Sequence, residues 1–531
     1  MQQSDSVERA VLRALHKRMR IPAASTDADY LSTSLDPRSH NDPLVFKKTY
    51  LCFSFLRKWK GLDAGIPLEE VTFNSWRAAE SQCFKTNVRL ETEITSGLHP
   101  KALNFISEVQ RKILKILGRP NLNRISDLCR HSAGATFDLR RGSHLADKEL
   151  VKPTITKRCL PLYLKLYSDG PSSPLESSFE IVRGNRCIMV PKSAKTHRMI
   201  SAEPTLNVYV QQGIGRYIRE RLKLSGVDLS DQTINQDRAF HALVDDLSTI
   251  DLSMASDTLC YNLIKLLLPP QWFDILDASR SDLSYYKGKW YLNSKFSSMG
   301  NSYTFELESL IFFALCQTMS ELLARREGRE VVPVTVYGDD IICGSSDYNE
   351  ISTMLAYFGF TLNADKSYTR GSRFFESCGK HFFDLDEVTP VYQKEICRHP
   401  HDYVRLYNRL LRGSIRLNLR DEFKPALFCV LDYYKKNFSR APVPFGPLVD
   451  EDSWFCDPDS AFAGDSMKIL ALREVKKVHS YAPEREEACY KYKLRHWGSY
   501  SNSSKHGYFE ECTPHAYSFR RVRIWRSCLR M

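Results

Sequence analysis

The sequence predicts an α+β fold in which an antiparallel sheet is flanked by helices. The order of elements over residues 244–362 indicates this: a short strand, a long apolar helix, a hairpin, an amphipathic helix and a further strand. The helix is expected over 304–326 and the hairpin over 334–344. At 531 residues the chain is also long enough to divide into several lobes.

In the N-terminal third, two stretches have the pattern of helices, over 67–91 and 99–118. The second ends at Gly118, a plausible C-cap. Residues 166–178, LYSDGPSSPLESS, are rich in turn-forming residues and indicate a long loop or linker. The apolar residues at helical spacing in the second helix are Leu103, Ile106, Val109, Ile113 and Ile116.

Further along, short strands at 187–190 and 199–200 are expected to bracket a basic loop, and a helix is expected over 206–226. A last helix is predicted over 346–360, with Ser346 as its N-cap, Gly359 as its end, and an apolar face. That face consists of Ile351, Leu355 and Phe358.

The composition excludes several classes of protein. The 15 cysteines have no CxxC spacing, which argues against a disulfide framework or a structural zinc site. No secretory signal is visible and 263–273 is too short to span a bilayer, so a soluble intracellular protein is expected. With 75 Lys and Arg against 63 Asp and Glu, the net charge of +12 favours an anionic partner such as nucleic acid, although only weakly.

The stretch VTVYGDDIICG, 334–344, puts two carboxylates side by side in a turn. Gly338 suits a tight turn, and the apolar residues on both sides anchor the hairpin in a core. Adjacent Asp339 and Asp340 are tolerable in a rigid turn if a divalent cation such as Mg²⁺ or Mn²⁺ neutralises them. An ordinary Asp-rich turn is the alternative, which this motif alone does not exclude.

A second acidic stretch, TIDLSMASD at 249–257, favours the metal interpretation. Asp251 ends a short β-prone run, and if that strand lies beside the hairpin, Asp251 meets Asp339 across the sheet. Three carboxylates with Asp340 could then hold two metal ions roughly 3.5–4 Å apart, as phosphoryl transfer requires.

Two further stretches offer polar groups for a nucleotide. In SSMGNSYTFELES, 297–309, Thr304 and Glu308 share one helical face, and Ser298 and Asn301 could bond a sugar hydroxyl or a phosphate. A capped helix start is the plainer interpretation of this stretch. In RCIMVPKSAKTHRM, 186–199, three cations could bind a triphosphate, although a solvated basic loop is the commoner explanation of this stretch taken alone. They are Lys192, Lys195 and Arg198.

Lys366, in GFTLNADKS at 359–367, could protonate a departing pyrophosphate, although such a lysine is more often plain surface. The aromatic stretch 373–383 could brace a nascent strand or belong to the core. The Arg- and aromatic-rich end of the chain, 518–531, could contact nucleic acid, although a solvated face is commoner.

Taken in order, these blocks resemble the replicase subunit of the small positive-strand RNA bacteriophages, the leviviruses. The residues that carry the resemblance are VPKSAKTHRMISAEP, GVDLSDQTINQ, IDLSMASD, SMGNSYTFELES, YGDDIIC, YFGFTLNADKS and FFESCGKHF, over about 180–395. The resemblance implies a right-hand fold of fingers, palm and thumb. It places the N-terminal region and fingers at 1–236, including a nucleotide-binding loop at 183–200. The palm follows at 237–395, with a fingers insertion near 259–296, and the thumb and C-terminal region at 396–531.

The resemblance also implies an RNA-dependent RNA polymerase that replicates and transcribes a single-stranded RNA phage genome. It implies two Mg²⁺ ions, for which Mn²⁺ can substitute, bound by Asp251, Asp339 and Asp340, and Lys366 as general acid. Lys192, Lys195 and Arg198 would hold the incoming triphosphate, and Ser298, Gly300 and Thr304 would position template and ribose. The family works in the bacterial cytoplasm with translation elongation factors Tu and Ts and the largest ribosomal small-subunit protein.

This sequence departs from the wider polymerase pattern at two positions. Asp251 and Asp257 are six residues apart, where many relatives keep five, and Glu308 stands where many have Asn. These departures leave open which residue recognises the ribose 2′-hydroxyl. The candidates are Asp257, Ser298, Asn301 and Thr304.

Two other functions are compatible with part of these features. A reverse transcriptase shares the double-aspartate turn, but the Ser-x-Gly…Thr block and the absence of an RNase H-like acidic domain argue against it. A non-enzymatic RNA-binding protein would use the +12 charge, but three convergent carboxylates would repel RNA unless metal neutralises them.

Overall fold

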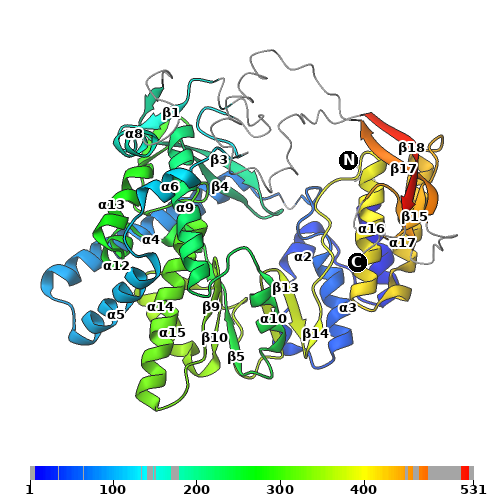
Figure 1. Cartoon of the computed structure of the whole chain (residues 1–531). Helices are drawn as coiled ribbons and strands as arrows, with labels where there is room; N and C mark the ends of the chain where they lie inside the picture. Colours follow the sequence, from blue (N-terminus) through cyan, green and yellow to red (C-terminus); the bar gives the residue numbers. More distant parts are fainter. Residues whose placement is uncertain are drawn as a thin grey trace.

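The computed structural model describes residues 6–448, 452–457, 466–475 and 516–525, apart from 34, 64, 133, 140–147, 149–150 and 169–178. Residues 68–128 and most of the chain between the predicted linker and residue 360 gather in one helix-rich body, and the two ends of the described chain gather in a second (Figure 1). The first three residues of the predicted linker end helix α8, and the rest of it lies outside the described residues.

The second body combines the two ends of the described chain. Helix α1 packs against α17, and side chains from residues 7–59 share one apolar core with side chains from 391–455. The apolar stretch 50–59 is therefore core. Its elements are α1 (Val7–Met19), α2 (Asp27–Ser32), η1 (Pro37–Ser39), α3 (Pro43–Ser54), α16 (Pro400–Arg416), α17 (Arg420–Asn437), β15 (Phe445–Pro447), β16 (Phe455–Asp457), β17 (Ser466–Val475) and β18 (Ala516–Trp525).

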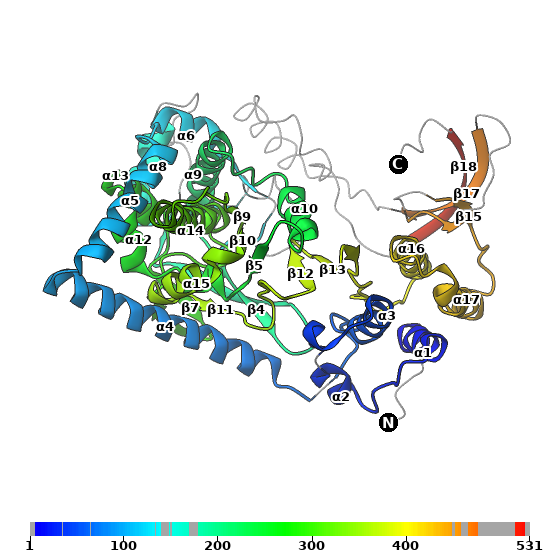
Figure 2. The same ribbon diagram turned by 90° about the horizontal axis from the view of Figure 1, so that it is seen from below.

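The helix-rich body contains a four-stranded sheet in the order β4-β3-β7-β8, which joins the basic hairpin at 185–202 to the hairpin at 283–292. Helix α4 runs along one edge of the molecule (Figure 2) and contacts β4. The elements are α4 (Leu68–Ser96), α5 (Pro100–Leu117), α6 (Leu122–Leu128), β1 (Thr154–Thr156), α8 (Leu160–Ser168), β2 (Glu180–Val182), β3 (Asn185–Pro191), β4 (His197–Ala202), α9 (Thr205–Leu224), α12 (Tyr261–Leu267), α13 (Pro270–Ser279), β7 (Leu283–Tyr286) and β8 (Lys289–Leu292).

The predicted antiparallel sheet is confirmed, with the strand order β5-β10-β9. A second antiparallel sheet, β12-β13-β14, adjoins it and covers α10. The elements are α10 (Thr233–His241), β5 (Leu247–Ile250), β6 (Leu252–Ser253), α11 (Ala255–Thr258), α14 (Thr304–Glu327), β9 (Thr335–Tyr337), β10 (Asp340–Gly344), η3 (Ser345–Asp347), α15 (Tyr348–Tyr357), β11 (Thr361–Leu362), β12 (Phe374–Ser377), β13 (Lys380–Phe383) and β14 (Asp386–Glu387).

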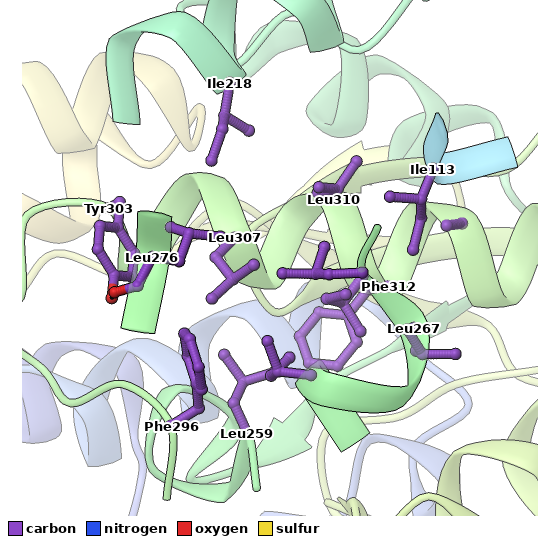
Figure 3. Close-up of a cluster of buried hydrophobic side chains, with 14 of the residues drawn as sticks. Ile113, Ile218, Leu259, Leu267, Leu276, Phe296, Tyr303, Leu307, Leu310 and Phe312 are labelled. Carbon is purple, nitrogen blue, oxygen red and sulfur yellow. The ribbon is translucent and has the colours of Figure 1, made fainter. Parts of the chain in front are cut away.

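Helix α14 is the centre of the largest core. Figure 3 shows Leu307, Leu310 and Phe312 among apolar side chains from α5, α9, α12 and α13, and all three are fully buried. Within the described residues it is the helix whose length and composition would suffice to cross a membrane, but 72% of its most apolar window is buried in the protein. The predicted buried helix is confirmed.

Two details of the predicted helices are wrong. Leu103 lies on the outer side of α5 and is 47% exposed, whereas the other predicted apolar positions of that helix are buried. Ser346 does not cap α15, because residues 345–347 form a separate 3₁₀ turn. The buried carboxylate of Asp347 holds that turn by bonding Ser320 and Arg329.

Candidate active site

The three predicted metal-binding acids lie at one end of the β5-β10-β9 sheet. The ladder pairs Ile250 of β5 with Ile341 of β10, so the next position outward sets Asp251 beside Asp340. Asp339 occupies the adjoining turn, and its charge contributes to raising the pKa of Asp251. The predicted meeting of the two acidic stretches is thus confirmed, with Asp340 as the cross-strand neighbour.

Glycine is required at the turn for two reasons. Gly338 has φ +65°, a conformation that disfavours side chains. A Cβ there would also come within 2.7 Å of the ring of Phe305 on α14. The amide of Gly338 donates to the hydroxyl of Ser309 on α14 at 3.0 Å, so this helix fixes the position of the turn. The acids are consequently held rigidly.

Asp251 is held by the segment that follows β11. The Asn363 side-chain amide donates to Asp251 Oδ1 at 2.8 Å, and the Asp251 amide donates to the Ser367 hydroxyl at 3.1 Å. Lys366 Nζ lies 3.7 Å from Asp251 Oδ2. The predicted Lys366 therefore stands directly beside the acids.

The acids raise one another's proton affinity. Burial, followed by the charge of Asp339, raises the pKa of Asp340 to about 7. Burial also raises the pKa of Asp251, against the effect of Lys366. Mutual repulsion of this kind is what a divalent cation relieves, so the donor set suits such an ion. Across the described residues, no group of three or more histidine, cysteine, aspartate or glutamate side chains is arranged so that it could hold a metal ion.

Glu376 is a further acid that the sequence analysis did not identify. It lies on β12, and its Oε1 is 3.8 Å from Lys366 Nζ. Burial lowers the pKa of Lys366, but Glu376 and Asp251 raise it more, so the ammonium is retained. In the sequence, only the FFESCGKHF block, which contains Glu376, pointed to this part of the chain. The same hairpin is also core, because its four phenylalanines are buried.

The basic loop belongs to the β3–β4 hairpin. The pKa of Lys192 is lowered by burial and by Arg198, while the charges of Asp251 and Asp339 act in the opposite direction, so Lys192 lies within electrostatic reach of the acids. Lys195 and Arg198 are exposed on the same hairpin. The Thr72 hydroxyl on α4 accepts from the His197 amide at 2.9 Å and pins the loop.

The first third of the chain also reaches this region. Lys58 Nζ lies 3.8 Å above the ring of Tyr392. The pKa of Lys58 is lowered by burial and then by the charges of Lys394 and Lys366. Nothing in the local sequence around Lys58 indicated such a position, because only the fold brings residues 55–60 beside 392–394.

The polar residues before α14 build their own loop. Thr304 Oγ1 donates to the carbonyl of Ser298 at 2.9 Å, and Asn301 Oδ1 accepts from the Tyr303 amide at 3.1 Å. A Cβ on Gly300 would lie 2.2 Å from the Ser201 carbonyl, so the loop presses against β4. All three polar side chains are buried; Asn301 Nδ2 is left without a hydrogen-bond partner among the described residues. The structure thus gives these residues the local bonds of a capped helix start.

Asp257 is already engaged inside the protein. Its Oδ1 lies 2.7 Å from Nζ of Lys295, which is 1% exposed, and Glu80 of α4 lies 3.5 Å from the same nitrogen. Asp257 itself is 3% exposed. The suggestion that Asp257 binds the ribose is therefore not supported: its carboxylate neutralises a buried lysine.

Its neighbour Ser256 makes a different contact. Ser256 Oγ donates to Glu308 Oε2 at 2.6 Å, which links α11 to α14. Burial raises the pKa of Glu308 to about 8, and the bond from Ser256 only partly opposes this. The predicted face shared by Thr304 and Glu308 is confirmed, since both side chains are buried on α14.

Comparison with known proteins matches residues 1–522 to a family described as RNA replicase, beta-chain. The chain is 38% identical over 387 residues to the RNA-directed RNA polymerase subunit beta of Escherichia virus Qbeta, which covers 72% of this chain and 64% of that one. It is 34% identical over 456 residues to the same subunit of Enterobacteria phage SP, covering 83% and 77%. Among solved structures, the RNA-dependent RNA polymerase of BmCPV at elongation state aligns with a TM-score of 0.42 and 10% identity, over 62% of this chain and 32% of that one.

Proposed function

Because the chain belongs to the RNA replicase beta-chain family, we propose that it is an RNA-directed RNA polymerase that replicates and transcribes a single-stranded RNA phage genome. The observation that carries the proposal is the convergence of Asp251, Asp339 and Asp340 at one end of a rigid sheet, within electrostatic reach of Lys192 on a cationic hairpin. A site that joins nucleotides needs acids that bind metal ions for the reaction, and it needs cations that bind the triphosphate. A plain RNA-binding protein needs only the second.

The right-hand arrangement is part of the proposal. We assign the region around the β5-β10-β9 sheet to the palm and the body that contains the β4-β3-β7-β8 sheet to the fingers. The thumb includes α16 and α17. The common core of α1–α3 with α16 and α17 supports counting the first sixty residues with the thumb side. The segment boundaries at 236 and 396 stay predictions.

Two Mg²⁺ ions, replaceable by Mn²⁺, are the proposed cofactors, held by Asp251, Asp339 and Asp340. When bound, such ions activate the attacking hydroxyl and stabilise the charge of the transition state. Burial, and then the charge of Asp339, raise the pKa of Asp340 to about 7, and a cation bound here would relieve the repulsive part of that effect.

The chain's own residues bind and orient the nucleotide. Lys192, Lys195 and Arg198 attract the triphosphate, lysine as a point charge and arginine as a fork. Lys366 keeps its proton because of Glu376 and Asp251, and can give it to the leaving pyrophosphate. Glu376 thereby positions the general acid.

Ser298, Gly300 and Thr304 contribute by shaping the loop against β4, which sets the floor on which template and ribose would lie. Because the polar side chains are buried and bonded within their own loop, we assign these residues a structural role rather than direct contact with template or ribose.

Partners and location complete the proposal. We expect the chain to act in the cytoplasm of the infected bacterium, with translation elongation factors Tu and Ts and the largest ribosomal small-subunit protein. Most apolar side chains of 50–59 belong to the core shared with α16 and α17 and so are not available as a docking surface. Copurification of each factor with the tagged chain tests this part; recovery of the chain alone, fully active, would reject it.

The function is tested by incubating the purified chain with an RNA template, four ribonucleotides and Mg²⁺, alone and with those factors, and measuring product length. Template-length RNA is expected. The matched control is Asp339→Asn, which changes one oxygen to nitrogen and should yield no product. Synthesis of DNA in preference to RNA would instead favour a reverse transcriptase.

A further inference from the structure

The hairpin that carries Glu376 has a histidine directly opposite this acid. Strands β12 and β13 pair antiparallel, and the ladder sets Glu376 against His381. Residues that face each other across such a ladder point to the same side of the sheet. Accordingly, His381 Nε2 lies 3.5 Å from Glu376 Oε1, the same oxygen that is 3.8 Å from Lys366 Nζ. One carboxylate oxygen is thus contacted by both the histidine and the proposed general acid.

A tyrosine from the start of the chain contacts the other side of the imidazole. Tyr50 lies on α3, and its hydroxyl oxygen is 2.7 Å from His381 Nδ1, although the two residues are 331 positions apart in the sequence. Helix α3 lies beside β13 (Figures 1 and 2), and the ring of Phe46 stacks on the rings of Tyr50 and Phe383 there. A line of polar contacts therefore runs from α3 through the hairpin to the catalytic acids.

The chemistry of these groups assigns the direction of the bonds. A carboxylate beside an ammonium only accepts, so the proton between Glu376 and His381 belongs to Nε2. His381 is 5% exposed, and burial lowers the pKa of its imidazole against the opposing charge of Glu376, so the ring is neutral. Nδ1 is then an acceptor, and the hydroxyl of Tyr50 donates to it.

The histidine is held firmly, whereas the lysine is not. The amide of His381 donates to Thr389 Oγ1 at 2.9 Å, and its ring lies edge-on to that of Phe374, with 5.9 Å between the ring centres. Lys366 is exposed, and its ammonium has only long contacts to Asp251 and Glu376 among the described residues. A lysine ammonium stands on a flexible four-carbon stem, so its position depends on how rigidly its partners are held.

We infer that Tyr50 and His381 are positioning residues for the proposed general acid. The hydroxyl of Tyr50 orients the imidazole of His381, and the imidazole holds Glu376 in place beside the ammonium. The inference deepens the proposed function and rests on it, because there the ammonium of Lys366 gives its proton to an oxygen of the leaving pyrophosphate. Helix α3, which supplies no acid of the reaction, thereby becomes a part of the catalytic apparatus.

Loss of this support should change the rate of nucleotide addition rather than nucleotide affinity. The proton of Lys366 is needed when the leaving group departs, so its misplacement acts on the transition state. The triphosphate is bound by the cations of the β3–β4 hairpin in the proposed function, and these stay in place. A change that acts on the transition state alone lowers kcat and leaves KM as it was.

The experiment measures kcat and KM for a ribonucleotide on one RNA template with the full chain, in the presence of whatever partners the wild type needs. Tyr50→Phe should lower kcat roughly 3- to 10-fold, the value of one lost hydrogen bond, and should leave KM unchanged. His381→Leu should lower kcat at least as much. His381→Gln should retain most of the rate, because its amide can still donate to Glu376.

A second readout follows the basicity of the leaving group. Ribonucleotides with a methylene or a difluoromethylene bridge between the β- and γ-phosphorus atoms release different bisphosphonates, and the fluorinated one is the weaker base. A weaker base needs the proton of the general acid less. The loss caused by Tyr50→Phe should therefore be smaller with the difluoromethylene substrate than with the methylene substrate. A defect of packing alone would lower both rates by the same factor.

Tyr30→Phe is the matched control. It removes a hydroxyl that holds the end of α3, by donating to the Cys52 carbonyl and accepting from the Leu56 amide, each at 3.0 Å. This variant should be less stable to heat but keep the wild-type kcat. An unchanged kcat in Tyr50→Phe, an equal loss with both bridged substrates, or an equal loss in Tyr30→Phe overturns the inference while the polymerase assignment stands. A wild-type chain that adds no ribonucleotide to any RNA template overturns the proposed function, and the inference with it.

Discussion

Replacing Asp340 by asparagine should stabilise the metal-free chain at neutral pH while it damages nucleotide addition. Burial and Asp339 raise the pKa of Asp340 from 3.8 to about 7. One pKa unit corresponds to about 1.4 kcal/mol, so three units set an upper value of roughly 4 kcal/mol for the cost of ionising this carboxyl in the folded chain. Asp340 is half-buried, and water screens part of the repulsion. We therefore expect about 1–3 kcal/mol.

The sign of the pH dependence follows from the raised pKa. Below about pH 4 the carboxyl is protonated in both the folded and the unfolded chain, so it does not lower the free energy of unfolding. Between the two pKa values the unfolded chain releases the proton and the folded chain keeps it, so the free energy of unfolding falls as the pH rises. Above about pH 7 both forms are ionised and the full penalty is present. The asparagine variant lacks this contribution.

The assay is denaturant unfolding of the wild type and Asp340→Asn in a chelator, at pH 5 and pH 8. The variant should gain about 1–3 kcal/mol at pH 8 and about a third of that at pH 5. Adding Mg²⁺ at pH 8 should stabilise the wild type more than the variant, because the cation binds the ionised acids. Equal stability of the two chains at both pH values would refute the electrostatic reasoning. Nucleotide addition by the variant should fall and recover in part with Mn²⁺, which tolerates varied ligand geometry.

Three further outcomes are expected. Asp251→Asn or Asp339→Asn should abolish nucleotide addition and leave RNA affinity in a gel-shift assay almost intact, since affinity comes mainly from contacts to phosphates; substantial activity would reject the metal assignment. Arg198→Ala should raise the ribonucleotide KM more than it weakens template binding, and the reverse pattern would make the loop a template contact. Lys295→Met should lower the free energy of unfolding by about 3–5 kcal/mol, because Asp257 stays buried without its cation; unchanged denaturation would argue against that ion pair.

The parts of the fold that the sequence predicted well depend on short-range patterns. The hairpin at 334–344 and the buried helix at 304–326 each carry their apolar residues within a few turns or one strand, so local spacing suffices. The turn chemistry of Gly338 is equally local. The meeting of Asp251 with the hairpin needed one assumption, that the two strands pair, and the ladder between β5 and β10 supplies it.

The errors at the site come from side-chain direction, which spacing leaves open. Asp257 is an acid close to Asp251 in the sequence, and it was one of four open candidates for binding the ribose. In the fold, α11 turns that carboxylate inward to Lys295 and leaves Ser256 on the accessible side. The partner Lys295 lies 38 residues away, so no window of local sequence contains the contact that decides the matter.

The body formed by both ends of the chain explains why no catalytic motif could be recognised in the first third of the sequence. Residues 55–60 bond to the segment 392–394 through two backbone hydrogen bonds, and the ring of Tyr392 lies under Lys58. That segment follows directly from the β12-β13-β14 sheet, which carries Glu376. A charge from the start of the chain is thereby fixed within electrostatic reach of Lys366. The site is therefore assembled by long-range packing of both chain ends around locally encoded acids, and mutations in the apolar core of α1–α3 should act on catalysis through the position of that charge.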